Sequence, residues 1–183
     1  MHLLKQAAQP LENDYITVTV KGKDFLISLS SAPLFHSRSW TISVMGRLRG
    51  YLIESKHRGE FFHRLAVDCP DGLYVDHINR DRTDNRISNL RICSRRENSY
   101  NRSIGRNNTS GFKGVFKHIY GWRVLVVKNN KHRYVGIYDS PQMGALAYDA
   151  AALEEFGEFA ALNFPNGPFF TLEEINNYVV GTS

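Results

Sequence analysis

The chain has 183 residues, of which 42% are hydrophobic and 12% aromatic, and its formal net charge is +5. This length suits one domain or two small ones, and the apolar content supports packed cores, which excludes a disordered chain. There is no apolar run of about 18 residues and no signal-peptide pattern, so we expect a cytoplasmic protein with no membrane partner. Cys69 and Cys93 lack a CxxC arrangement, which excludes a disulfide framework and a cysteine zinc cage.

Basic residues are concentrated in the middle of the chain. Residues 77–135 contain 14 Lys/Arg against 3 Asp/Glu, whereas residues 1–76 contain 9 against 8 and residues 136–183 contain none against 7. A basic region of this density attracts a polyanion and releases its counterions, which is typical of nucleic-acid binding. Taken alone, such a region is more often a solvated face.

Short β-branched runs predict strands in the first half of the chain. The Lys21-Gly-Lys-Asp24 segment lies between two of these runs and predicts a hairpin. Residues 60–67 lead to the turn signal Asp71-Gly72. The strands expected here are 15–20, 25–29, 40–44, 50–54, 74–76 and 90–93.

A short helix and a domain boundary are predicted next. Ser94 is a suitable N-cap with Glu97 at the capping-box position, which favours a helix over 95–102. Residues 105–111 have the Gly, Asn and Ser composition of a linker, and we place the domain boundary there.

Three strands and a helix are predicted beyond the linker. Ser140 and Pro141 form an N-cap and a first-turn proline, and the alanine-rich run that follows ends before Gly157. Residues 171–180 predict a last short helix. The expected strands are 112–118, 122–128 and 132–138.

The segment from Val75 to Asn98 contains an unusual density of acidic, imidazole and amide side chains. Phosphodiester hydrolysis needs a base to activate water and a hard cation to neutralise charge on the phosphate and the leaving oxygen. Asp76 and His77 offer a ligand and a base side by side. Because neighbours in a regular strand point to opposite faces, a kink or bulge at 76–77 is needed to aim both at one centre.

Five short motifs in this region resemble those of the HNH (ββα-metal) nucleases, particularly the phage and intron homing endonucleases. The resemblance covers roughly residues 60–102. The motifs are His63-Arg-Leu, Val75-Asp-His-Ile-Asn, Asp84-Asn-Arg, Ser88-Asn-Leu-Arg and Glu97-Asn98. The resemblance implies a β-hairpin and a helix that together bind one divalent ion.

The resemblance also implies individual roles. His77 would be the general base, Asp76 and Asn98 the metal ligands, and Asn89 the residue that ties the hairpin loop together. Many relatives carry a third histidine where this chain has Asn98, and a carboxylate with an amide suits Mg²⁺ or Mn²⁺ better than Zn²⁺. His63 would pack beside the site or contact phosphate.

Some of these residues have plainer explanations. A lone histidine is usually a satisfied core or surface residue, although the surrounding motifs favour a catalytic His77. Asn85, Arg86 and Asn89 could be ordinary turn residues, and a role for Asn85 in framing the site is equally consistent with the sequence. The expected phosphate contacts, some of which could be merely solvated, are Arg80, Arg82, Arg91, Arg95 and Arg96.

Residues 110–165 resemble the ethylene-responsive-factor (APETALA-type) DNA-binding domain, which lays a three-stranded sheet in the major groove with a helix behind it. The matching segments are Ser110–Val115, Gly121-Trp122, Tyr134–Asp139, Ala147–Ala151 and Leu162–Pro165. Six positions fall at or near the DNA-facing side of that family: Lys113, Phe116, His118, Arg123, His132 and Tyr134.

Alternation in the middle strand predicts which side chains face the helix. Trp122, Val124 and Val126 share one face, so we expect Trp122 in the core rather than as a base-stacking platform. Ala147 and Ala151 lie four residues apart and would let the helix approach the sheet closely. The sheet segment 112–135 has six Lys/Arg and no acid, whereas the helix and tail have only acids, which favours DNA on the sheet side.

We therefore expect an α+β protein with an N-terminal tail (1–12), an HNH nuclease domain (13–104), a linker (105–111), a DNA-binding domain (112–166) and a C-terminal tail (167–183). Its expected function is Mg²⁺-dependent hydrolysis of double-stranded DNA by a monomer, site-specific and with a nick in one strand. The rival function is a DNA-binding regulator with an inactive nuclease domain. An RNA-processing enzyme has no support from a recognisable RNA module.

Overall fold

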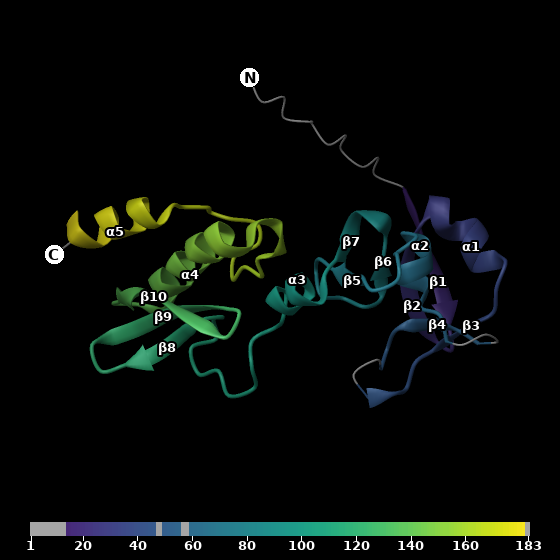
Figure 1. Ribbon diagram of the computed structural model, residues 1–183, viewed down its shortest axis with the longest axis horizontal. Coiled ribbons are helices and arrows are strands. Elements are labelled where there is room, and N and C mark those ends of the chain that lie inside the picture. Colours follow the sequence, from purple (N-terminus) through teal and green to yellow (C-terminus); the bar gives the residue numbers. More distant parts are fainter. Residues whose placement is uncertain (1–13, 47–48, 56–58, 182–183) are drawn as a thin grey trace, which may run out of the picture. The chain divides into compact units, whose positions relative to one another are not determined.

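The computed structural model describes residues 14–46, 49–55 and 59–181, and the predicted tail 1–12 lies outside them. The fold is α+β, with several small sheets and five α-helices among the described residues (Figure 1). The chain divides into two compact units between Arg95 and Arg96. No described helix is long and apolar enough to span a membrane.

The first unit begins with the predicted hairpin. Strand β1 (Tyr15–Val20) pairs antiparallel with β2 (Lys23–Ser28), and the short β6 (Asp84–Asn85) pairs parallel with β2. Alternating residues of β1 and β2 face a core that includes Phe25 and Ile27, both fully buried. The parallel pairing matters for the site because it attaches Asn85 to a buried strand.

Short helices and a second hairpin complete that core. The 3₁₀ turn η1 (Leu29–Ser31) leads into α1 (Ala32–His36), and β3 (Trp40–Ile42) pairs with β4 (Leu52–Glu54), which confirms two further predicted strands. Residues 60–67, for which the sequence pattern indicates no particular element, contain α2 (Phe62–Ala66).

A third hairpin carries the motif residues. Strand β5 (Tyr74–His77) pairs antiparallel with β7 (Leu90–Cys93), and the turn η3 (Ile87–Asn89) precedes β7. The register runs from Tyr74 opposite Cys93 to His77 opposite Leu90 without a shift. The pairing therefore contains no bulge at 76–77, where the sequence led us to expect a kink or bulge.

Helix α3 (Arg95–Tyr100) follows β7 and is shorter than predicted. The division of the chain lies at its start, before the linker expected at 105–111. The reason lies in the second unit, where the ring of Tyr100 stacks on Phe156 at 4.2 Å between centroids. The 105–111 segment itself is irregular but tied down, since Asn108 and Ser110 both donate to the carbonyl oxygen of Phe112.

The second unit has the predicted three-stranded antiparallel sheet with a helix on one face (Figure 1). Its strands, in the order β10-β9-β8, are β8 (Val115–His118), β9 (Gly121–Lys128) and β10 (Lys131–Tyr138). Helix α4 (Pro141–Phe156) begins as expected, because the Ser140 hydroxyl accepts a hydrogen bond from the amide of Met143.

Helix α4 packs closely on the sheet. Val124 and Val126 of β9 are fully buried, as are Ala147 and Ala151 of α4, which confirms the predicted faces. A Cβ atom placed on Gly144 would lie 3.2 Å from a methyl carbon of Val115, so the small residue permits the approach.

The remaining elements lie beyond α4. The turn η4 (Gly157–Phe159) follows it, and α5 (Leu172–Gly181) confirms the helix predicted over 171–180. Ile175 of α5 is buried in the core of the second unit. Trp122 packs against the same core, as predicted.

Candidate active site

His77, the last residue of β5, is buried with only 4% of its surface exposed. Its Nε2 lies 3.1 Å from Oδ1 of Asn85, the residue that β6 attaches to β2. The Asn85 amide nitrogen points toward the carbonyl oxygens of Arg82 and Thr83, at 3.4 and 3.5 Å, so the amide oxygen faces the imidazole. A carbonyl-type oxygen at Nε2 favours the tautomer that carries its proton there, with the basic lone pair on Nδ1.

The surroundings keep this imidazole neutral. Burial lowers the pKa of His77, and the hydrogen bond to Asn85 and the nearby carboxylates Asp76, Asp84 and Asp81 offset only part of that effect. Because the pKa of His77 lies below its ordinary value, the ring is uncharged at neutral pH and can accept a proton from water.

The aromatic rings of His63 and Tyr51 lie beside His77. The ring of His63 lies 5.2 Å from that of His77, and the Tyr51 ring lies 4.9 Å from His63 and 5.8 Å from His77. Burial, together with His77 and Arg64, lowers the pKa of His63 to about 3. Nδ1 of His63 is the one buried side-chain nitrogen or oxygen without a hydrogen-bond partner among the described residues.

The loop between β5 and β7 is held by a network centred on Asn89. Its Oδ1 accepts from the Asn79 amide, and its Nδ2 donates to Asn79 Oδ1 and to the Asp84 carbonyl oxygen. Asp84 in turn pairs with Arg86 through two N–H groups, at 2.8 and 2.6 Å. Burial would raise the pKa of Asp84, but hydrogen bonds from Arg86 and Asn79 lower it overall. The loop that carries Asn85 is thereby fixed at both ends.

Asp76 is paired with Arg91, its register partner on β7. Nε and an Nη of Arg91 lie 2.9 and 2.6 Å from the same carboxylate oxygen, and both side chains are nearly buried. Arg91, expected to contact phosphate, is thus directed at Asp76. The ion pair places a cation against the buried Asp76 carboxylate, which offsets part of the cost of burying its charge.

The other motif residues are more exposed. Asn98 is half-buried on α3, and Arg80, Arg82, Arg95 and Arg96 are exposed. No cluster of three or more His, Cys, Asp or Glu side chains suited to a metal ion occurs in the described parts of the chain.

In the second unit, five of the six expected DNA-facing residues share the face of the sheet opposite α4. Phe116 pairs with Arg123 in the strand register, and Arg123 alternates with the buried Val124. Tyr134 pairs with Leu125, and a bulge between Tyr134 and Gly136 separates it from the helix-facing end of β10. We call this side of the sheet the outer face, and its side chains are Phe116, His118, Arg123, His132 and Tyr134.

The charged residues of this sheet are distributed differently from the prediction. Lys113 lies before β8, where its ammonium donates to the carbonyl oxygens of Tyr100 and Arg102. Lys128 and Arg133 bind Glu155, and Arg133 also binds Glu154, all at the α4 side. Of the six basic residues in this segment, Arg123 is the one that lies on the outer face.

Comparison with known proteins matches residues 60–100 to the HNH endonuclease family. This part of the chain is thus similar to an HNH endonuclease domain. An uncharacterized HNH endonuclease of Acanthamoeba polyphaga mimivirus is 29% identical over 153 residues, 81% of this chain and 80% of that protein. Protein 3.8 of Escherichia phage T7 is 33% identical over 93 residues, 50% of this chain and 76% of that protein.

A shorter similarity concerns a plant protein. The ethylene-responsive transcription factor WRI1 of Arabidopsis thaliana is 36% identical over 74 residues, 40% of this chain but 17% of that protein. No solved structure matches the chain significantly.

The first unit contains site residues that sequence reasoning did not select. Asn79 and Asp84 hold Asn89 and the loop, and both stand inside quoted motifs, so motif membership could have indicated them. Tyr51 precedes the family match and has no sequence signal. Its position beside His77 follows from the fold alone.

Proposed function

We propose that this protein is a metal-dependent DNA endonuclease in which His77 is the general base. The observation that carries the proposal is the His77–Asn85 contact at 3.1 Å, in a buried site that leaves the imidazole neutral. A buried neutral imidazole with one fixed nitrogen suits proton abstraction at the other.

In the proposed reaction, Nδ1 of His77 takes a proton from water while the water oxygen bonds to phosphorus. The bond from phosphorus to the 3′ oxygen breaks, and this oxygen takes a proton from solvent. The products are a 5′-phosphate and a 3′-hydroxyl. Asn85 holds the ring in place as His77 gains charge, and Asp76, Asp81 and Asp84 favour the protonated imidazole that forms.

Asp76 and Asn98 would supply oxygen ligands to Mg²⁺ or Mn²⁺. A carboxylate and an amide suit a hard divalent cation. The bound cation would neutralise charge on the phosphate and the leaving oxygen.

The second unit would hold the DNA by the outer face of its sheet. The similarity to an ethylene-responsive transcription factor supports this part, together with the exposure of Phe116, Arg123 and Tyr134. One catalytic histidine per chain favours a nick in one strand by a monomer. Site-specific cleavage of this kind would suit a homing endonuclease of a virus or mobile element.

Incubation with supercoiled plasmid tests the proposal. Wild-type protein should convert the plasmid to nicked circles with Mg²⁺ and not with a chelator, and His77→Ala should bind without converting it. Asn98→Ala should need a higher Mg²⁺ concentration for half-maximal rate, by about 10- to 100-fold. If wild-type protein retards DNA in a gel yet never cuts it, the protein is a DNA-binding regulator.

A further inference from the structure

Arg82 presents an exposed guanidinium in a fixed position within the first unit. Its guanidinium carbon lies 4.6 Å from the centre of the Tyr51 ring, within the range of a cation–π contact. One Nη donates to the carbonyl oxygen of Arg49 at 2.8 Å. The stack and the hydrogen bond together restrict a side chain that would otherwise sample many rotamers.

Two independent connections join Arg82 to the catalytic base. The Tyr51 ring, on which Arg82 stacks, lies 5.8 Å from the His77 ring. The amide of Asn85 approaches His77 with its oxygen and the Arg82 backbone carbonyl with its nitrogen. The Tyr51 ring therefore contacts both side chains, and Asn85 links the imidazole to the backbone of Arg82.

Four other arginines of this unit are committed to different partners. Arg38 binds Glu54 and Glu60, Arg86 binds Asp84, and Arg91 binds Asp76, so a carboxylate offsets each charge. Arg64 donates to three backbone carbonyls. The Arg82 guanidinium contacts a neutral ring and a carbonyl oxygen, so its positive charge stays available to an anion.

We propose that Arg82 binds the non-bridging oxygens of the reacting phosphate beside His77, and that Tyr51 positions its guanidinium. This inference rests on the proposed function and specifies which arginine touches the phosphorus centre. A planar guanidinium matches two phosphate oxygens, and it stabilises the extra negative charge of the transition state more than the charge of the bound substrate.

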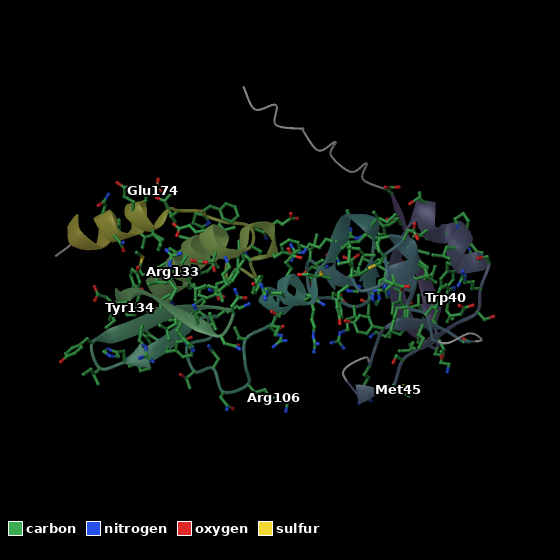
Figure 2. The ribbon with its side chains drawn as sticks, in the orientation of Figure 1. Trp40, Met45, Arg106, Arg133, Tyr134 and Glu174 are labelled. Atoms are coloured by element: carbon green, nitrogen blue, oxygen red, sulfur yellow. The ribbon has the colours of Figure 1, made fainter. Side chains whose placement is uncertain are left out.

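The test compares single-turnover cleavage rates with DNA affinity for matched variants of the full chain. Arg82→Ala should lower the rate constant by about 100- to 1000-fold. Arg106→Ala, the control, removes one exposed arginine of the second unit (Figure 2). Both variants should weaken DNA binding by a similar small factor, but the rate constant of Arg106→Ala should stay near the wild-type value. Arg82→Lys keeps the charge but not the fork or the stack, and should remain at least about 10-fold slow.

Tyr51 variants separate positioning from packing. Tyr51→Phe keeps the ring and should cleave near the wild-type rate, whereas Tyr51→Leu should lose about 10-fold in rate constant with unchanged affinity. In the Arg82→Ala background, Tyr51→Leu should add almost no further loss, because the two residues act as a unit. Trp40 fluorescence checks that each variant is folded.

Three outcomes overturn the inference. Arg82→Ala could match Arg106→Ala in both rate and affinity, which would make Arg82 an ordinary surface charge. The Tyr51→Leu loss could be fully additive with Arg82→Ala, which would remove the positioning role. If wild-type protein fails to cleave while His77→Ala binds DNA equally well, both this inference and the proposed function are overturned. If only the role of Arg82 is wrong, wild-type protein still cleaves DNA and cleavage still depends on His77.

Discussion

The two units bury very different interiors. Apart from Asn101 and Asp149, every buried polar side chain among the described residues belongs to the first unit. The core of the second unit is apolar and consists mainly of valine and alanine between the sheet and α4. Burying polar groups costs free energy unless each is hydrogen-bonded, and in the first unit every fully buried side-chain nitrogen or oxygen among the described residues except Nδ1 of His63 has a partner. In the second unit the candidate binding residues lie instead on the outer face of the sheet.

Among substitutions that test this difference between the units, replacement of Asn85 should have the largest effect, and the effect should be on the rate of cleavage. Asn85→Leu preserves approximate volume but removes the oxygen at Nε2 of His77, so the imidazole can rotate and change tautomer. We expect the single-turnover rate constant to fall about 100-fold with little change in DNA affinity. Asn107→Leu, at an exposed asparagine of the second unit, controls for the substitution. A wild-type rate in Asn85→Leu would show that Asn85 is only a turn residue.

The buried carboxylate of the second unit should behave as a structural group. Asp149 accepts hydrogen bonds from the backbone amides of Asn163 and Phe164 and from the Asn163 side chain. Burial raises the pKa of Asp149, and these bonds act against that shift. Asp149→Ala leaves the donors unpaired and should lower the free energy of unfolding by about 2–3 kcal/mol.

Trp122 fluorescence in a Trp40→Phe background reports urea unfolding of this unit separately. The exposed Asp139→Ala is the matched control. Equal midpoints for the two aspartate variants would contradict a structural role for Asp149.

His63 should make the first unit sensitive to acid. Its folded pKa of about 3 lies below the ordinary 6.5, so between these values the unfolded chain binds a proton that the folded chain does not. Stability from this group is therefore complete above pH 6.5 and is lost as pH falls toward 3, by about 2 kcal/mol at pH 5. His63→Phe should remove this loss.

The measurement is urea unfolding at pH 7.5 and 5, followed by Trp40 fluorescence in a Trp122→Phe background. His36→Phe, at an exposed histidine of α1, controls for the added ring. An identical pH dependence in wild type and His63→Phe would mean that His63 is not buried in solution.

The smallest effect is expected on DNA affinity, when basic residues of the sheet in the second unit are replaced. Arg123 lies on the outer face, whereas Arg133 is held by Glu154 and Glu155 at the α4 side. Arg123→Ala should weaken DNA binding by about 1 kcal/mol and Arg133→Ala by less, in anisotropy titrations at fixed salt. A larger loss for Arg133→Ala would place the DNA on another surface.

Local patterns predicted the elements well. The alternation of β9, the Ser140-Pro141 start of α4 and the hairpin at 15–29 depend on neighbours in sequence, and all were confirmed. Nonlocal pairing could not be predicted. The parallel contact of β2 with β6 sets the position of Asn85, and the approach of Tyr51 to His77 depends on how two hairpins pack.

The positions of individual charges also depend on nonlocal pairing. Six basic residues lie in one segment, but the strand register directs Lys128 and Arg133 to the acidic end of α4. Likewise, Arg91 lies opposite Asp76 because the hairpin register places it there. Net charge along a sequence does not determine which side of a sheet carries it.

The most direct test of the central claim is the single-turnover rate of DNA cleavage by His77→Ala with saturating protein and Mg²⁺. Removal of the general base should slow cleavage by about 100- to 10,000-fold while DNA affinity and Trp40 fluorescence stay at wild-type values. Cleavage by His77→Ala within a few-fold of the wild-type rate would contradict the account.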